Sequence, residues 1–256
     1  MVRGTMEPAQ PIIQLTSIHS GYGKKQIIHG VSIGASPGEI VAVIGANGAG
    51  KSTLLKTVAG LLPCWSGHIV LGDKDITNEP PHRRARMGIA YAMQGGAVFS
   101  SLTPSEHLDL ARRQAKLRGV PALDLPPWAA DIIAKPGSAG LLSGGQQQVL
   151  AVVTVLASHP NILLCDEPSA GLSPVAAGQL IARIVSLAKE AGMTVFCWAE
   201  QRIADLLPLA DRALFLRQGR VLAETHNPKG WLNPETLSKM TFDQKANGGY
   251  EEMERS

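Results

Sequence analysis

A glycine-rich segment, Gly45-Ala46-Asn47-Gly48-Ala49-Gly50-Lys51-Ser52, is the first part of this 256-residue chain that could do chemistry. Its glycines allow backbone N–H groups to turn inward around phosphate oxygens, and the positive end of a following helix strengthens that attraction. In this pattern the Lys51 ammonium would reach the β- and γ-phosphates of a nucleotide, and the Ser52 hydroxyl would bind Mg²⁺. A chance glycine turn is the alternative, but the apolar run before the segment and the helical pattern after it favour phosphate binding.

Two adjacent carboxylates, Asp166 and Glu167, end the apolar run 162–165. Because burying a charge without a partner is costly, acidic residues at this point need a reason to be there. A magnesium ion would supply that reason for Asp166, and Glu167 would be placed to orient or deprotonate an attacking water. The alternative is a solvated pair of acidic residues at a strand end, followed by a proline turn. That interpretation would be favoured for an isolated Asp-Glu-Pro, but the phosphate-binding segment upstream disfavours it here.

A third segment, Leu142-Ser143-Gly144-Gly145-Gln146, stands between the other two and on its own is typical of a flexible loop. Ser143 can cap a following helix, whose N-terminus would then be able to face a phosphate group.

The elements that must position these residues alternate between strands and helices. Three short apolar runs, at 40–44, 162–165 and 194–198, fit central parallel strands that are covered on both faces. Helical patterns follow the first run at 53–59 and begin again at Pro174, with Ser173 as the N-cap. This alternation predicts an α/β core with a parallel sheet.

Two smaller parts complete the expected organisation. Residues 12–33 and 68–73 predict strands with tight turns, which together would form a small antiparallel β subdomain beside the nucleotide site. Thr103-Pro104-Ser105-Glu106 has the form of a capping box and should begin a helical insert, which four prolines break into short pieces. We expect a nucleotide-binding core formed by residues 12–94 and 141–225. A helical insert at 95–140 would separate these two stretches, and a polar tail at 226–256 would follow them.

Composition narrows the class of protein further. A net charge of +3 and an aromatic content of 4% argue against nucleic acid as a partner, since that needs a dense basic face and rings for base stacking. The three cysteines form no C-x-x-C pair, so zinc ligands are not expected. Cys165 and Cys197 lie in apolar runs and are expected to be small core residues in a reducing compartment. Residues 1–10 lack the apolar segment of a signal peptide, and the run 149–157 is far too short to span a membrane. We therefore expect a cytoplasmic protein, in which any membrane role must come through a partner.

Taken together, Gly45–Thr53, Leu142–Gln148 and Ile162–Ser169 resemble the ATP-binding subunit of an ABC transporter. The resemblance covers roughly residues 12–225 and implies the ABC ATPase fold: a RecA-like P-loop core with a parallel sheet, a small antiparallel β subdomain and a helical insert. It also implies ATP and Mg²⁺ as cofactors and head-to-tail pairing of two ATPase subunits. ATP bound to Gly45–Thr53 of one subunit would then be capped by residues 143–145 of the other.

The resemblance assigns further roles. Tyr22 matches the aromatic residue that stacks on adenine, with an ordinary turn aromatic as the alternative. Gln94 matches a glutamine that senses Mg²⁺ and links to the helical insert, with a polar loop residue as the alternative. The implied catalytic residues are Glu167, Lys51, Gln201 and Gln94; the implied metal ligands are Ser52, Gln94 and Asp166; and the implied ATP-binding residues are Tyr22, Gly45, Asn47, Gly48, Ala49, Gly50, Lys51, Ser52, Thr53, Ser143, Gly144, Gly145 and Gln146.

Two departures from the usual pattern point to one branch of the family. Gln201 stands where most ABC ATPases have a switch histidine, and its amide cannot take up a proton at neutral pH. Ser173 stands where aspartate is usual. Both resemble the smaller ATPase of importers of branched-chain amino acids, urea and short amides. The chain departs from that branch at the surface that the resemblance assigns to coupling, at Gly96, Ala97, Thr154 and the proline-rich stretch 121–127.

The implied partners are a second ATPase subunit (identical or sister), transmembrane permease subunits and, indirectly, a solute-binding protein. ATPases of exporters, soluble ABC-type regulators and a nucleotide-responsive scaffold with little turnover are the alternatives. Two groups of basic residues are either solvated faces or contacts for anionic headgroups or an acidic loop of a transmembrane partner. They are Arg83, Arg84 and Arg86, and Arg112, Arg113, Lys116 and Arg118.

Overall fold

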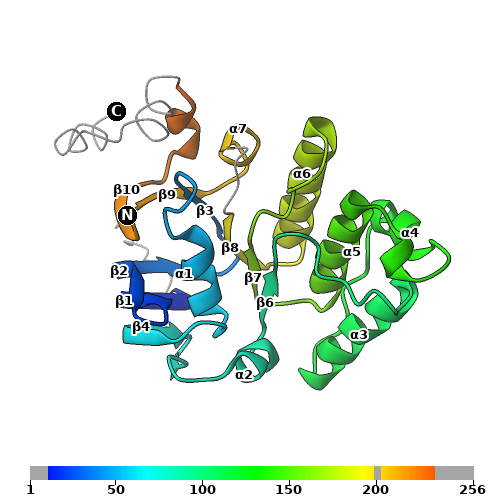
Figure 1. Cartoon of the computed structure of the whole chain (residues 1–256), viewed down its shortest axis with the longest axis horizontal. Helices are drawn as coiled ribbons and strands as arrows, with labels where there is room; N and C mark the ends of the chain where they lie inside the picture. The colour runs from blue at the N-terminus through cyan, green and yellow to red at the C-terminus, as the bar shows by residue number, and fades with distance from the viewer. Residues whose placement is uncertain (1–10, 199–202, 234–256) are drawn as a thin grey trace, which may run out of the picture.

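The computed structural model describes residues 11–198 and 203–233, and its centre is a six-stranded sheet with the strand order β10-β9-β3-β8-β7-β6 (Figure 1). The strands are β3 (Ile40–Ile44), β6 (Ile89–Ala92), β7 (Ile162–Cys165), β8 (Thr194–Trp198), β9 (Arg212–Arg217) and β10 (Arg220–Thr225). Neighbouring strands run parallel except for β10, which pairs antiparallel with β9. Every residue of β3 and β7 is buried, which explains their continuous apolar sequences and confirms the predicted α/β core.

A second sheet has four antiparallel strands in the order β2-β1-β4-β5. Its members are β1 (Ile13–Tyr22), β2 (Lys25–Ala35), β4 (Cys64–Leu71) and β5 (Lys74–Asp75). The pairing of β1 with both neighbours shifts register near Ser17, whose φ of 49° departs from the extended conformation. The expected antiparallel β subdomain is therefore present, and Tyr22 lies at the end of its first strand.

Helices cover both faces of the six-stranded sheet. Figure 1 shows α1 (Lys51–Val58) between the two sheets, whereas α5 (Gly144–Ala157) and α6 (Pro174–Glu190) lie on the opposite face. Shorter elements connect the strands: α2 (Pro81–Arg86), α7 (Ile203–Leu206) and the 3₁₀ turn η2 (Pro228–Leu232). The phosphate-binding segment leads into α1, and the Ser143-Gly144-Gly145 segment leads into α5. The positions of these two helices therefore fix the positions of both glycine-rich segments.

The stretch between β6 and α5 forms a helical layer at one end of the molecule (Figure 1). It contains α3 (Pro104–Leu117), α4 (Pro127–Ile133) and the 3₁₀ turn η1 (Ala139–Leu141), and both helices pack against α5. The predicted capping box is confirmed, since Thr103 Oγ1 accepts from the Glu106 N–H while the Glu106 carboxylate accepts from the Thr103 N–H. Among the described residues, no helix combines the length and apolar character that a membrane crossing requires.

Candidate functional site

The phosphate-binding segment connects the end of β3 to the start of α1, and two of its glycines have no room for a side chain. Gly45 has a φ of 156°, and an added Cβ would lie 2.1 Å from the Leu216 carbonyl oxygen. Gly50, the N-cap of α1, has a φ of 106°, and its Cβ would lie 2.9 Å from Ile28 Cδ1. The glycines therefore let the backbone turn tightly and present its N–H groups at a helix N-terminus.

Lys51 folds back over this segment. Its ammonium donates hydrogen bonds to the carbonyl oxygens of Gly45, at 2.7 Å, and Ala46, at 3.0 Å, and the side chain is only 7% exposed. A buried ammonium beside a helix N-terminus makes a strongly anion-attracting site. These donors are of the kind that bind a nucleotide phosphate.

A cavity of about 380 Å³ opens beside this segment. Most residues expected to bind ATP line it, as do Glu167, expected to act on the attacking water, and Gln94, expected to sense Mg²⁺. The expected residues that line it are Tyr22, Asn47, Gly48, Gly50, Lys51, Ser52, Thr53, Gln94 and Glu167. Ile27 of β2 also lines the cavity and was not foreseen from the sequence. Tyr22 is 46% exposed at the edge, so its ring has a free face on which a base can stack.

Two hydroxyl groups converge on the carboxylate of Asp166. Ser52 Oγ donates to Asp166 Oδ1 at 2.7 Å, and the Tyr91 hydroxyl donates to Asp166 Oδ2 at 2.7 Å. Asp166 is 2% exposed. A hydroxyl and a carboxylate oxygen in contact are hard donors of the kind Mg²⁺ prefers when nucleotide phosphates supply other ligands. The residues present therefore fit a magnesium ion bound by Ser52 and Asp166.

Glu167 lies next to this pair and faces the cavity. Its Oε2 accepts a 2.6 Å hydrogen bond from Gln94 Nε2, although the two residues are 73 positions apart in the sequence. The Glu167 backbone has a φ of 47°, a left-handed conformation that costs a glutamate free energy. Strain of this kind is common where a side chain must be held in a functional position.

The Ser143-Gly144-Gly145 segment does not contribute to this cavity. Ser143 caps α5, with its Oγ accepting from the Gln146 N–H at 3.4 Å and the Gln146 Oε1 accepting from the Ser143 N–H at 3.1 Å. Ser143 and Gly144 are both exposed, and neither these residues nor Gly145 and Gln146 are among the described residues that line the cavity. The expected Gln201 lies outside the described residues.

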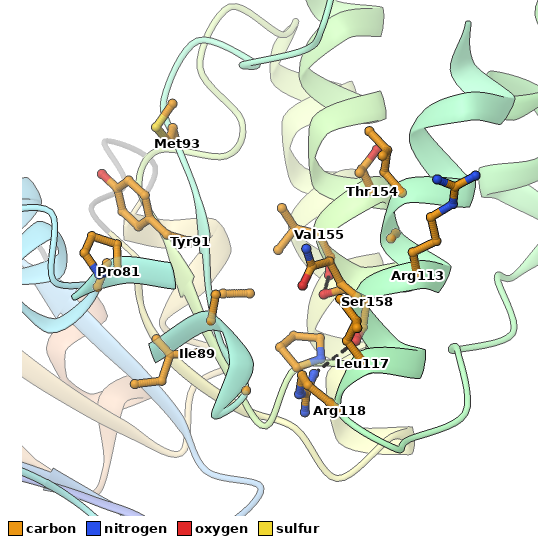
Figure 2. Close-up of a pocket in the computed structure, with 18 of the residues that line it drawn as sticks. Pro81, Ile89, Tyr91, Met93, Arg113, Leu117, Arg118, Thr154, Val155 and Ser158 are labelled. Atoms are coloured by element: carbon orange, nitrogen blue, oxygen red, sulfur yellow. Dashed lines mark hydrogen bonds between the residues drawn. The ribbon is translucent and has the colours of Figure 1, made fainter. Parts of the chain in front are cut away.

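A second, larger hollow of about 680 Å³ lies between the sheet and the helical layer (Figure 2). Figure 2 shows Pro81, Ile89, Tyr91 and Met93 on one side and Thr154 and Val155 of α5 on the other. We call it the groove. Several of its apolar side chains are open to solvent: Leu61, Met93, Phe99, Leu110 and Leu117.

Two of the seven basic residues singled out from the sequence have structural roles instead. Arg84 is 2% exposed, and its guanidinium donates to the carbonyl oxygens of Thr57, Val58, Thr77 and Glu79 at 2.7–2.8 Å. Burial lowers the pKa of this guanidinium. Arg118 likewise donates to the carbonyl oxygens of Ser158 and His159, beyond the end of α5, and to Asn161 Oδ1. For Arg84 neither expected interpretation holds, because the side chain is inside the fold.

Comparison with known proteins decides the family. The ABC transporter family matches residues 28–170, which include the phosphate-binding segment, residues 143–145 and the Asp166-Glu167 pair. The chain belongs to the ABC transporter family. It is an ABC ATPase, an ATP-hydrolysing subunit of such a transporter.

Two curated relatives of this ABC ATPase have similar lengths. It is 37% identical to a probable branched-chain amino acid transport ATP-binding protein, LivF, of Archaeoglobus fulgidus, over 82% of this chain and 90% of the relative. It is also 37% identical to the high-affinity branched-chain amino acid transport ATP-binding protein BraG of Pseudomonas aeruginosa, over 88% and 97%. A crystal structure of a nucleotide-free ATP-binding cassette from an ABC transporter superimposes with a TM-score of 0.72 at 25% identity, covering 89% of this chain and 98% of that one. The resemblance to the branched-chain amino acid ATPases and the ABC ATPase fold are thus confirmed.

Besides Ile27, sequence reasoning missed Tyr91, which contacts a candidate metal ligand. Its hydroxyl contacts Asp166 across 75 positions of sequence. The available signal was a hydroxyl-bearing ring inside an otherwise apolar strand, three residues before Gln94.

Proposed function

We propose that this ATPase binds Mg–ATP in the cavity beside Gly45–Thr53 and hydrolyses it only when a second subunit covers that cavity. The observation that carries the proposal is the separation of two groups on one chain. Lys51, Ser52 and Glu167 face the cavity, whereas the exposed Ser143 caps α5 and does not line the cavity. A helix N-terminus attracts anions, but this one does not line the ATP cavity of its own subunit. It is therefore suited to contact the phosphates of ATP bound to a partner subunit.

Each side chain in the cavity has a distinct task in this proposal. ATP supplies the phosphoanhydride bond that is cleaved, and Mg²⁺ supplies positive charge beside its phosphates. Lys51 and the backbone N–H groups hold the phosphates, while Ser52 and Asp166 hold the metal ion. Glu167 orients the attacking water or takes up its proton, and Gln94 holds the Glu167 carboxylate through the 2.6 Å hydrogen bond.

Metal contact by Gln94 requires the amide to turn. At present its Nε2 points to Glu167, so a role as a magnesium ligand requires the amide oxygen to face Ser52 and Asp166 instead. Both roles of Gln94 are compatible with an exposed side chain on the loop that follows β6.

The groove is the surface we propose for the permease. It exposes apolar side chains from both the sheet and the helical layer, with Arg113 and Gln114 among its polar lining residues. An apolar hollow with a few polar residues suits an amphipathic segment of another protein. The ATPase would then lie peripherally at the inner face of the membrane, held there by permease subunits. The branched-chain amino acid relatives favour an importer of branched-chain amino acids, urea or related small polar solutes, which receives its cargo from a solute-binding protein.

Replacing Ser143 tests the shared site. Ser143→Ala should abolish ATP turnover while leaving the ATP affinity of the isolated subunit unchanged, as measured by fluorescence titration. Thr103→Ala is a matched control, because Thr103 also caps a helix through a capping box. Both changes should lower the free energy of unfolding by about 1 kcal/mol, and only the first should stop turnover. Equal loss of ATP affinity in the Ser143 variant, or equal loss of turnover in the control, contradicts the proposal.

Two further measurements test the base and the transport system. Glu167→Gln should abolish hydrolysis and leave ATP binding intact, and unchanged turnover would exclude Glu167 as the base. For transport, the ATPase should co-purify from membranes with a multi-spanning protein and support ATP-dependent uptake of leucine or urea in proteoliposomes. Recovery only as a free monomer in the presence of ATP would count against the permease partner.

A further inference from the structure

Tyr91 connects two sites that the proposed function treats separately. Its hydroxyl donates a 2.7 Å hydrogen bond to Asp166 Oδ2, and its side chain also lines the groove, where Figure 2 shows it beside Met93. Tyr91 lies on β6, and Asp166 directly follows the neighbouring strand β7, whose Leu164 pairs with Tyr91. The backbone holds Asp166 in the same place, because its N–H donates to the Ala92 carbonyl oxygen at 2.9 Å.

The two hydroxyl groups bind opposite oxygens of one carboxylate. Ser52 binds Oδ1 and Tyr91 binds Oδ2, so rotation of the Asp166 carboxylate about its last side-chain bond would break both hydrogen bonds. A terminal bond of this type has a broad rotational preference of its own, so contacts must set its orientation. Asp166 is almost completely buried, and solvent therefore cannot readily replace a lost donor.

We propose that Tyr91 is a positioning residue that holds the Asp166 carboxylate in the orientation in which Oδ1 meets Ser52 and the magnesium ion. This inference rests on the proposed role of Ser52 and Asp166 as metal ligands. Tyr91 touches neither nucleotide nor metal in this arrangement and acts through Asp166. Because its ring forms part of the groove wall, the side chain that orients the metal ligand is also within reach of whatever fills the groove.

Tyr91→Phe tests the inference, because it keeps the ring and removes only the hydroxyl. The readout is the binding of Mn²⁺, a paramagnetic substitute for Mg²⁺, to the purified chain saturated with a non-hydrolysable ATP analogue, with free Mn²⁺ measured by electron paramagnetic resonance. We expect the apparent dissociation constant for Mn²⁺ to rise about tenfold, as for the loss of one hydrogen bond to a charged group. Affinity for the analogue in EDTA should not change.

Thr154→Val is the matched control. It removes a hydroxyl from the opposite wall of the groove, where Thr154 Oγ1 donates to the Leu150 carbonyl oxygen and not to Asp166. Its Mn²⁺ affinity should equal that of the unmodified chain. If Tyr91→Phe does not fold, Tyr91→Met, which lacks the hydroxyl but keeps an apolar side chain, should show the same weakening.

The outcomes separate this inference from the proposed function. If the unmodified chain binds no Mn²⁺ together with the analogue, the proposed metal site itself is wrong. If the unmodified chain binds Mn²⁺ and Tyr91→Phe binds it equally well, the positioning role of Tyr91 is wrong. Equal weakening of Mn²⁺ and metal-free nucleotide binding would also overturn it, since that pattern indicates a general structural defect.

Discussion

Arg84 offers a test of how the core supports the nucleotide site. Its guanidinium is buried between α1 and the segment that precedes α2, and it binds four backbone carbonyl oxygens. Two of them, at Thr57 and Val58, belong to the last turn of α1, where carbonyl groups have no partner within the helix. The helix that begins at the phosphate-binding segment is thus anchored at its other end by Arg84.

Arg84→Met should be strongly destabilising. The change leaves the carbonyl oxygens of Val58, Thr77 and Glu79 without this donor, whereas the Thr57 oxygen still accepts from the Gly60 N–H at 3.1 Å. An unsatisfied buried polar group costs about 1–3 kcal/mol. Taking the lower bound for each of the three oxygens, because relaxation and water recover part of the loss, the free energy of unfolding should fall by about 3 kcal/mol. That loss is a large share of the roughly 5–15 kcal/mol that stabilises an ordinary fold, and it corresponds to a decrease in Tm of roughly 6–12 °C.

Urea denaturation followed by circular dichroism measures this loss, and Arg86→Met is its control. Arg86 is an exposed arginine of the same short helix, and the same substitution there should change the free energy of unfolding by less than about 0.5 kcal/mol. If the two variants are equally stable, or if Arg84→Met loses less than about 1 kcal/mol, the four hydrogen bonds do not anchor α1 as described.

Two further predictions concern positions outside the cavity. Gly96 has a φ of 64° and an added Cβ would lie 2.8 Å from the Gln148 backbone, whereas Gly95 has a φ of 85° with open space around it. Gly96→Ala should therefore destabilise the chain clearly more than Gly95→Ala, which should lose only about 1–2 kcal/mol through backbone strain, and urea midpoints that coincide would contradict this. Hydrogen bonds from Thr77 and His68 lower the pKa of Asp75 to about 2. Because this folded-state pKa lies below the ordinary value of 3.8, the ionised Asp75 carboxylate stabilises the fold at neutral pH, and this contribution disappears as acid protonates it. The difference in free energy of unfolding between the unmodified chain and Asp75→Asn should therefore be constant near neutral pH and shrink below about pH 5. A stability difference that grows on acidification would show that the sign is wrong.

Local features of the site followed from the sequence because they depend on residues only a few positions apart. Ser143, Ser173 and Thr103 were expected at helix starts, and each side chain accepts from an N–H three residues further on. The glycines around Lys51 were expected to shape a phosphate loop, and they have the positive φ values that such a turn needs. Alternating apolar runs and helical patterns were sufficient to predict the parallel core.

The tertiary structure decided what distant residues do to one another. Gln94 meets Glu167 across 73 positions, Tyr91 meets Asp166 across 75, and Arg84 meets Thr57 across 27. These pairs form because β6 lies beside β7 and α2 lies near the end of α1. The pattern of apolar residues within one segment predicts a helix or a strand, but it does not predict which segments become neighbours. The sequence by itself determined which chemistry is present, since short motifs carry it. Only the folded chain decided that Tyr91 binds Asp166 and that Arg84 belongs to the core, because both depend on how separate elements pack.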